Sequence, residues 1–160
     1  MKHLIKTAWL CLLLLWTSYG YTQVSKQKLM KAFDQYQALV AGKGQVCHAA
    51  NAVVGDLNGD GVQDGIVQYT CLMAGGNIPV YTGWTLWLNE KGVIKPVLHC
   101  KDLGRALPLS IGAGGIISAL VYKYKKGDAS CCPSIKTPKK YQLKQQKIIS
   151  TIYYELEEVK

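Results

Sequence analysis

The sequence predicts an α+β fold, with an N-terminal helix packed on a mostly antiparallel, meandering sheet of about seven strands. Residues 25–40 place apolar side chains at the three- and four-residue steps of an amphipathic helix, and Ser25 stands where an N-cap belongs. After Gly42 and Gly44 the period changes to the alternation of β-strands, with only short turns between successive runs. Such turns favour antiparallel neighbours, because a parallel crossover needs a dozen or more residues.

Seven apolar or alternating runs predict the strands, over residues 65–73, 81–89, 93–100, 106–111, 116–124, 139–143 and 147–159. The sequence Asn-Glu-Lys-Gly at 89–92 predicts a hairpin in which Gly92 takes a positive φ. Pro96 has no N–H to donate to a neighbouring strand, so the strand that contains it is expected at a sheet edge. The last turn is expected at residues 144–146.

Residues 1–20 have the layout of a secretory signal peptide. Lys2 and Lys6 begin it, an apolar run covers residues 8–16, and Ser18 and Gly20 are small residues before the cleavage point. The apolar run is shorter than the roughly 20 residues of a membrane-spanning helix, and no later segment predicts one. We therefore expect a periplasmic or secreted protein whose residues 21–160 form a single α+β domain.

The charge of the chain is strongly basic and unevenly placed. The full sequence has a formal net charge of +9, and eight lysines lie within residues 123–147 against the single Asp128. A positive field at one end of the molecule predicts an anionic envelope component or an acidic protein as partner, whereas export separates the chain from nucleic acid. The alternative is that these lysines only solubilise sheet edges. The candidate partner-binding lysines are Lys123, Lys125, Lys126, Lys139 and Lys140.

Five cysteines follow the signal segment, and in an exported protein they predict disulfide bonds. The candidates are Cys47, Cys71, Cys100, Cys131 and Cys132. An odd number leaves at least one thiol unpaired, and the pairing is not determined by the sequence. A zinc site is disfavoured, because no Cys-x-x-Cys spacing occurs.

An aspartate-rich loop at residues 56–64, Asp-Leu-Asn-Gly-Asp-Gly-Val-Gln-Asp, predicts a calcium site. Calcium takes six to eight oxygen ligands, which side chains at loop positions 1, 3, 5 and 9 and the carbonyl at position 7 supply. Gly61 occupies position 6, where the chain must turn sharply. The predicted ligands are Asp56, Asn58, Asp60, Val62 and Asp64. A metal-free turn rich in Asp, Asn and Gly is the alternative, although its crowded carboxylates would repel one another.

This loop runs directly into an apolar strand, and in that it resembles the calcium loop of FG-GAP and VCBS-type repeats. The resemblance covers residues 54–69 and implies calcium ligation by the same five residues; it does not imply a propeller, because the chain contains one copy. The chain also contains a Cys-Cys-Pro-Ser segment at 131–134. With its single aspartate loop and this segment, the chain resembles a group of uncharacterised exported bacterial proteins. This second resemblance implies localisation and fold but no reaction.

Two tryptophans on one predicted strand are expected on opposite faces of the sheet. Trp84 shares its parity with Leu86 and Leu88 and is expected in the core. Trp87 is expected to be a surface aromatic residue that contributes to partner binding, with burial under the N-terminal helix or a lysine side chain as the alternative.

Two classes of function follow from these observations. The first is an exported, calcium-binding, non-enzymatic binding or inhibitory module of the bacterial cell envelope, with calcium as a structural cofactor. The second is an envelope hydrolase or another enzyme whose site the sequence does not reveal. No catalytic residue is predicted, because the adjacent pairs Cys47–His48 and His99–Cys100 would point to opposite faces of a strand.

Overall fold

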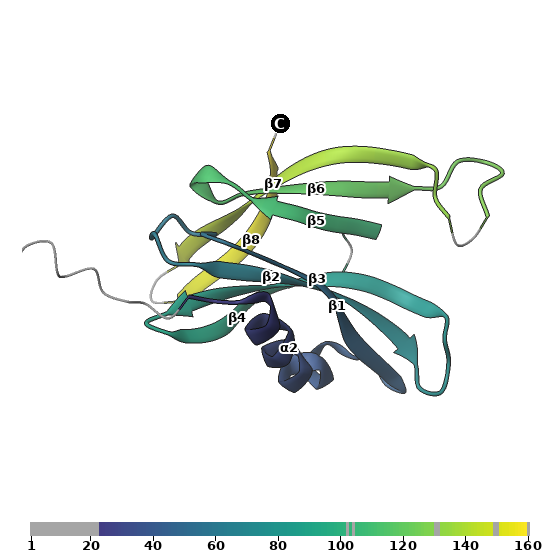
Figure 1. Ribbon diagram of the computed structural model, residues 1–160, viewed down its shortest axis with the longest axis horizontal. Coiled ribbons are helices and arrows are strands. Elements are labelled where there is room, and N and C mark those ends of the chain that lie inside the picture. The colour runs from purple at the N-terminus through teal and green to yellow at the C-terminus, as the bar shows by residue number, and fades with distance from the viewer. Residues whose placement is uncertain (1–22, 102, 104, 130–131, 149–150, 160) are drawn as a thin grey trace, which may run out of the picture.

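The computed structural model describes residues 23–159, except 102, 104, 130–131 and 149–150 (Figure 1). The predicted signal peptide and Cys131 lie outside the described residues. Within them the chain forms one α-helix, one short 3₁₀ turn (Ala113–Gly115) and eight strands. Their bounds are α2 (Lys26–Val40), β1 (Gln45–Gly55), β2 (Asp64–Met73), β3 (Pro79–Glu90), β4 (Val93–Cys100), β5 (Arg105–Ile111), β6 (Ile116–Lys123), β7 (Ile135–Ile148) and β8 (Thr151–Val159).

The strands form two four-stranded antiparallel sheets, each a meander in chain order, which we name sheet A (β1–β4) and sheet B (β5–β8). In Figure 1 the helix lies below sheet A and sheet B lies above it. The α+β class and the antiparallel meander are therefore confirmed, but the expectation of one sheet is wrong. Residues 83–89 of β3 are buried without alternation, and a sheet that is apolar on both faces needs a covering layer on each side.

Local signals at the helix and the first hairpins are confirmed. The Ser25 side chain accepts a hydrogen bond from the Lys28 N–H at 3.1 Å, as an N-cap should. The turn between β3 and β4 places Lys91 and Gly92 at φ values of 53° and 90°, the left-handed pair of a tight hairpin. The strand β4, with Pro96, forms an edge of sheet A.

Two strand predictions are wrong. The pattern of apolar residues did not predict β1, whose residues 45–55 include a register shift between Ala49 and Asn51 that breaks their alternation. The turn expected at residues 144–146 is absent, since β7 continues through them and pairs with β8 as far as Ile148. Its polar residues belong to a two-stranded ribbon, in which Lys144 is the cross-strand partner of Glu155, so their polarity does not mark a turn.

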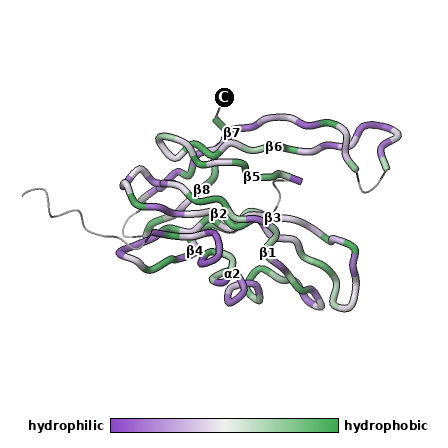
Figure 2. The backbone as a smooth tube through the Cα atoms, viewed as in Figure 1, coloured by the Kyte–Doolittle hydropathy of each residue, from purple (hydrophilic) through white to green (hydrophobic). Residues whose placement is uncertain are grey.

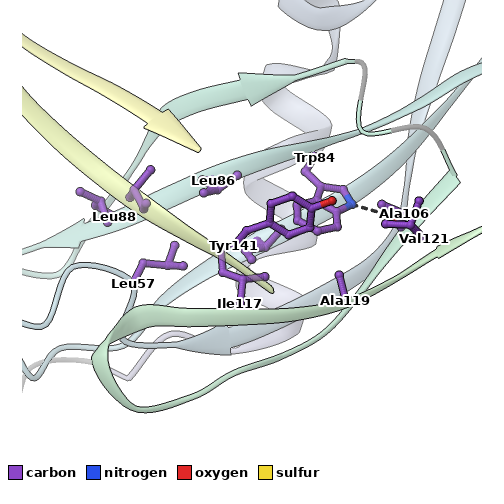
Figure 3. Close-up of a cluster of buried hydrophobic side chains, with 11 residues drawn as sticks. Leu57, Trp84, Leu86, Leu88, Ala106, Ile117, Ala119, Val121 and Tyr141 are labelled. Atoms are coloured by element: carbon purple, nitrogen blue, oxygen red, sulfur yellow. Dashed lines mark hydrogen bonds between the residues drawn. The ribbon is translucent and has the colours of Figure 1, made fainter. Parts of the chain in front are cut away.

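The hydrophobic core has two layers, one on each face of sheet A. Between the sheets, Trp84 packs edge-on against Tyr141 and donates its indole N–H to the carbonyl of Ala106 at 2.9 Å (Figure 3). Under the helix, Leu29 and Phe33 are fully buried against β1 and β2. The prediction for Trp84 is confirmed.

Trp87 lies in the layer under the helix and is only 3% exposed. Its ring meets that of Tyr36 edge-on, with 5.3 Å between centroids, and its indole N–H bonds to Thr85 Oγ1 at 2.8 Å. The expected surface role of Trp87 is therefore wrong, and the alternative of burial under the N-terminal helix holds. A helix on the outer face of sheet A turns that face into core.

Candidate functional site

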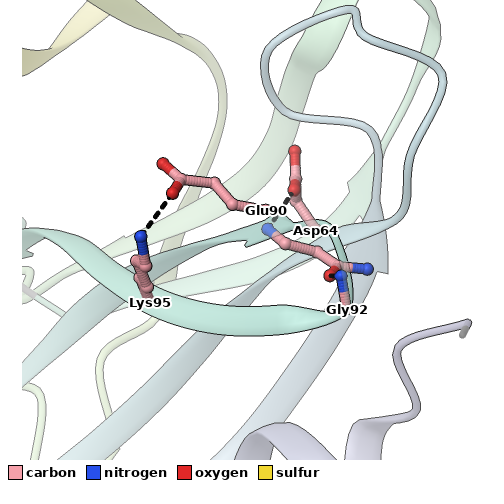
Figure 4. Close-up of polar contacts among 5 residues, drawn as sticks. Asp64, Glu90, Gly92 and Lys95 are labelled. Atoms are coloured by element: carbon pink, nitrogen blue, oxygen red, sulfur yellow. Dashed lines mark hydrogen bonds and ion pairs between the residues drawn. The ribbon is translucent and has the colours of Figure 1, made fainter. Parts of the chain in front are cut away.

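The aspartate loop connects β1 to β2, and its last residue, Asp64, is the structural centre of this end of the molecule. The Asp64 side chain is 1% exposed, and its two oxygens accept the backbone N–H groups of Leu57 at 2.9 Å and Asn89 at 2.8 Å. The first bond closes the loop on itself, and the second ties it to the end of β3 (Figure 4). One carboxylate thus holds three segments together.

The remaining polar residues of the loop fold its backbone around their side chains. The Asp56 carboxylate accepts the N–H groups of Gly59 at 2.7 Å and Gly61 at 2.9 Å. Both glycines have φ near +80°, a conformation that other residues rarely adopt. Asp60 accepts the N–H of Val62 at 2.8 Å, so the sharp turn expected at Gly61 is present.

The three carboxylates of the loop repel one another. Burial raises the pKa of Asp64, and the negative charges of Asp60 and Asp56 raise it further, whereas the backbone N–H groups of Asn89 and Leu57 lower it. Burial is the largest single cause, and burial together with the two negative charges outweighs the two hydrogen bonds. An ionised Asp64 is therefore stabilised by any nearby positive charge.

The predicted calcium ligands are all of a kind that calcium binds. All five would offer oxygen, as calcium prefers. However, the described part of the chain contains no group of three or more His, Cys, Asp or Glu side chains arranged to hold a metal ion. The carboxylates point instead to the backbone N–H groups of their own loop and of β3.

Disulfide bonding is confirmed for three of the five candidate cysteines, Cys47, Cys71 and Cys132, whereas Cys100 is not bonded. Cys47 and Cys71, which are register partners on β1 and β2, form a disulfide, and Cys132 is also disulfide-bonded. Cys100 carries a free thiol, whose pKa burial raises to about 11. Cys131, the fifth candidate, lies outside the described residues.

The two Cys–His pairs considered for catalysis are separated as expected. Cys47 is oxidised and has no thiol to offer. His99 bonds through its ring to the hydroxyl of Tyr69 on the helix side of sheet A, while Cys100 packs against the core between the sheets. Burial and the positive charge of Lys101 lower the pKa of His99.

The lysine-rich segment forms the β6–β7 hairpin and its connecting loop, where Figure 2 shows long hydrophilic stretches. Lys123, Lys125 and Lys126 are exposed at the free end of this hairpin. Lys140 is exposed further along β7, and Lys139 forms an ion pair with Glu158 of β8. The positive field is therefore concentrated at the hairpin end, because the acidic residues of β8 offset the lysines of β7.

A groove between the two sheets was not predicted from the sequence. It has a volume of about 860 Å³, with a floor that includes Gln68, Thr70 and Thr82 of sheet A and a wall that includes Arg105 and Tyr122 of sheet B. The sequence did contain an indication of this groove. Every second residue of β2 and β3 faces sheet B, and these residues change from apolar, at Ile66 and Trp84, to polar, at Thr70 and Thr82. A polar residue at a core-facing position marks the place where the core ends.

Comparisons with models of known protein families, with curated proteins and with solved structures find no match to this chain. The resemblance to FG-GAP and VCBS-type loops thus rests on the pattern of residues 56–64. No helix among residues 26–40 or elsewhere in the described chain has the length and hydropathy to span a membrane.

Proposed function

We propose that this chain is an exported binding module of the bacterial cell envelope, in which the aspartate loop takes up a structural calcium ion and the lysine-rich hairpin binds an anionic partner. The observation that supports it best is the buried, destabilised carboxylate of Asp64 beside the charges of Asp56 and Asp60. A bound calcium ion would neutralise these charges. Asp56, Asp60, Asp64, Asn58 and the Val62 carbonyl are the groups that would hold it.

The role assigned to calcium is structural and not catalytic. Asp64 links the loop to β3, so a cation at the loop would stabilise the end of sheet A through a bond that the protein already makes. An exposed ion pair between Lys95 and Glu90 also joins β3 to β4 at this end of sheet A (Figure 4). Such an exposed pair contributes little by itself.

Calorimetry and thermal melts with calcium, magnesium and chelator test the calcium proposal. We expect a dissociation constant of about 10⁻⁴ to 10⁻³ M, or somewhat tighter, as in extracellular modules. At tenfold saturation this stabilises the fold by about 1.4 kcal/mol. Asp60→Asn should remove the calcium effect, whereas Asp34→Asn, on the exposed face of the helix, should retain it. A melting temperature that is the same in calcium and in chelator contradicts the proposal.

Retention on an anionic polymer at low and high salt tests the proposed binding surface. Exposed charges are screened beyond about 8 Å at physiological ionic strength, so retention should fall as salt rises. The double variant Lys125→Glu/Lys126→Glu should lose retention, and the matched variant Lys31→Glu/Lys43→Glu, with the same change of charge on the helix side, should keep it. Equal retention of the two variants refutes the assignment to the hairpin.

A further inference from the structure

The groove lies where the two sheets separate beyond the end of their shared core. Its floor continues the inner face of sheet A, where Thr70 and Thr82 are cross-strand partners and Gln68 is paired with Trp84. In Figure 1 the β2–β3 hairpin and the β6–β7 hairpin both extend past β5 on this side of the molecule. The exposed side chain of Ile78, at the end of the β2–β3 hairpin, contributes to the rim.

The wall of the groove combines the positive charge of Arg105 with the aromatic ring of Tyr122, and Tyr124 and Lys136 lie beside these two residues. Arg105, Tyr122 and Lys136 are consecutive partners across β5, β6 and β7. The Arg105 guanidinium lies 5.1 Å from the ring centroid of Tyr124, and the Lys136 ammonium lies 5.9 Å from that of Tyr122. Among the described residues that line the groove none is acidic, so the groove favours an anionic ligand.

A peptide strand cannot extend sheet B at this groove. The edge strand β5 already uses its outward carbonyl groups: that of Ala106 accepts N–H groups of Trp84 and Gln68, at 2.9 and 3.2 Å, and that of Pro108 accepts the Asn51 amide at 3.4 Å. Pro108 also has no N–H to donate. Strand addition needs free backbone groups along an edge, so the groove must recognise its ligand through side chains.

We propose that the groove binds a sugar chain that carries carboxylate groups. The side-chain oxygen of Gln68, whose amide N–H already donates to Ala106, and the hydroxyl of Thr70 suit the hydroxyl groups of a saccharide. The ring of Tyr122 offers an apolar surface to a sugar ring. The positive charge of Arg105, whose guanidinium also lies against the ring of Tyr124, attracts a carboxylate group. This inference rests on the proposed function and assigns a chemical class to its anionic partner.

Calorimetry with three probes tests the assignment: a short oligogalacturonate, a neutral oligogalactoside of the same length, and poly-glutamate. The oligogalacturonate should bind more tightly than both others. Arg105→Gln should weaken its binding about tenfold or more, because the positive charge that attracts the carboxylate is lost. Thr70→Val, which keeps the size of the side chain, should weaken it several-fold, and Lys43→Gln should leave it unchanged.

The outcomes separate the groove from the lysine-rich hairpin. If oligogalacturonate binding depends on Lys125 and Lys126 but not on Arg105 or Thr70, the groove assignment is overturned and the proposed function stands. If poly-glutamate binds as well as the sugar and is equally affected by Arg105→Gln, the ligand class is wrong. If no anionic probe binds at low salt, both proposals are wrong. The melting temperature of Thr70→Val is the control for folding. If it equals that of the wild type, the loss of affinity is due to the lost hydroxyl and not to unfolding.

Discussion

Replacing Asp64 by alanine tests how much of the fold depends on one buried carboxylate. The substitution leaves the N–H groups of Leu57 and Asn89 without their acceptor, and both residues are at most 2% exposed. An unsatisfied buried donor costs about 1–3 kcal/mol, so two of them cost about 2–6 kcal/mol. Removal of a charge that burial disfavours returns part of this cost. We therefore expect a net loss in the lower part of this range, about 2 kcal/mol, which is a large fraction of the stability of a typical domain.

Urea unfolding in the presence of chelator, followed by tryptophan fluorescence, measures this loss without any contribution from calcium. Trp84 and Trp87 are both buried and report on the two core layers. Asp60→Ala is the matched control, because Asp60 is exposed and its bond to Val62 is local; it should cost less than about 1 kcal/mol. The reasoning is refuted if the two variants lose the same stability, or if Asp64→Ala changes the slope of the transition and not its midpoint.

Three further predictions concern the cysteines and one histidine. The double variant Cys47→Ser/Cys71→Ser opens a link of sequence separation 24 and should lose about 3 kcal/mol in urea unfolding; a loss below about 1 kcal/mol would contradict this. The Cys100 thiol should react slowly with a thiol reagent at pH 8 in the native protein and rapidly in urea, because its pKa is raised to about 11; equal rates would contradict its burial. The lowered pKa of His99 means that the unfolded chain binds the proton more tightly, so its contribution to stability is complete above its unfolded pKa of about 6.5 and is lost as the pH falls through the folded value. His99→Gln should make the unfolding free energy less dependent on pH in that range. If the pH profile of the variant equals that of the wild type, His99 does not contribute to the pH dependence of stability.

Features that depend on a few neighbouring residues were determined by the sequence. The helix and its N-cap at Ser25 follow from periodicity and a single polar side chain, and the β3–β4 hairpin follows from Gly92. Pro96 predicted the edge position of β4, because a residue without an N–H cannot donate to a neighbouring strand on that side. The place of the aspartate loop follows from its composition alone. The presence of at least one disulfide follows from the number of cysteines in a chain for which the sequence predicts export.

Features that depend on what covers a face were decided only by the tertiary structure. Both parities of β3 are apolar, so the sequence could not show that the helix buries Trp87 while sheet B buries Trp84. The pairing of Cys47 with Cys71 depends on the register of β1, a strand that periodicity did not reveal. The groove depends on where β5 contacts β1, β2 and β3, because these contacts leave Gln68 and its neighbours at the margin of the core. In each case the contact joins residues distant in the chain, and the free energy of that contact has no counterpart in local sequence.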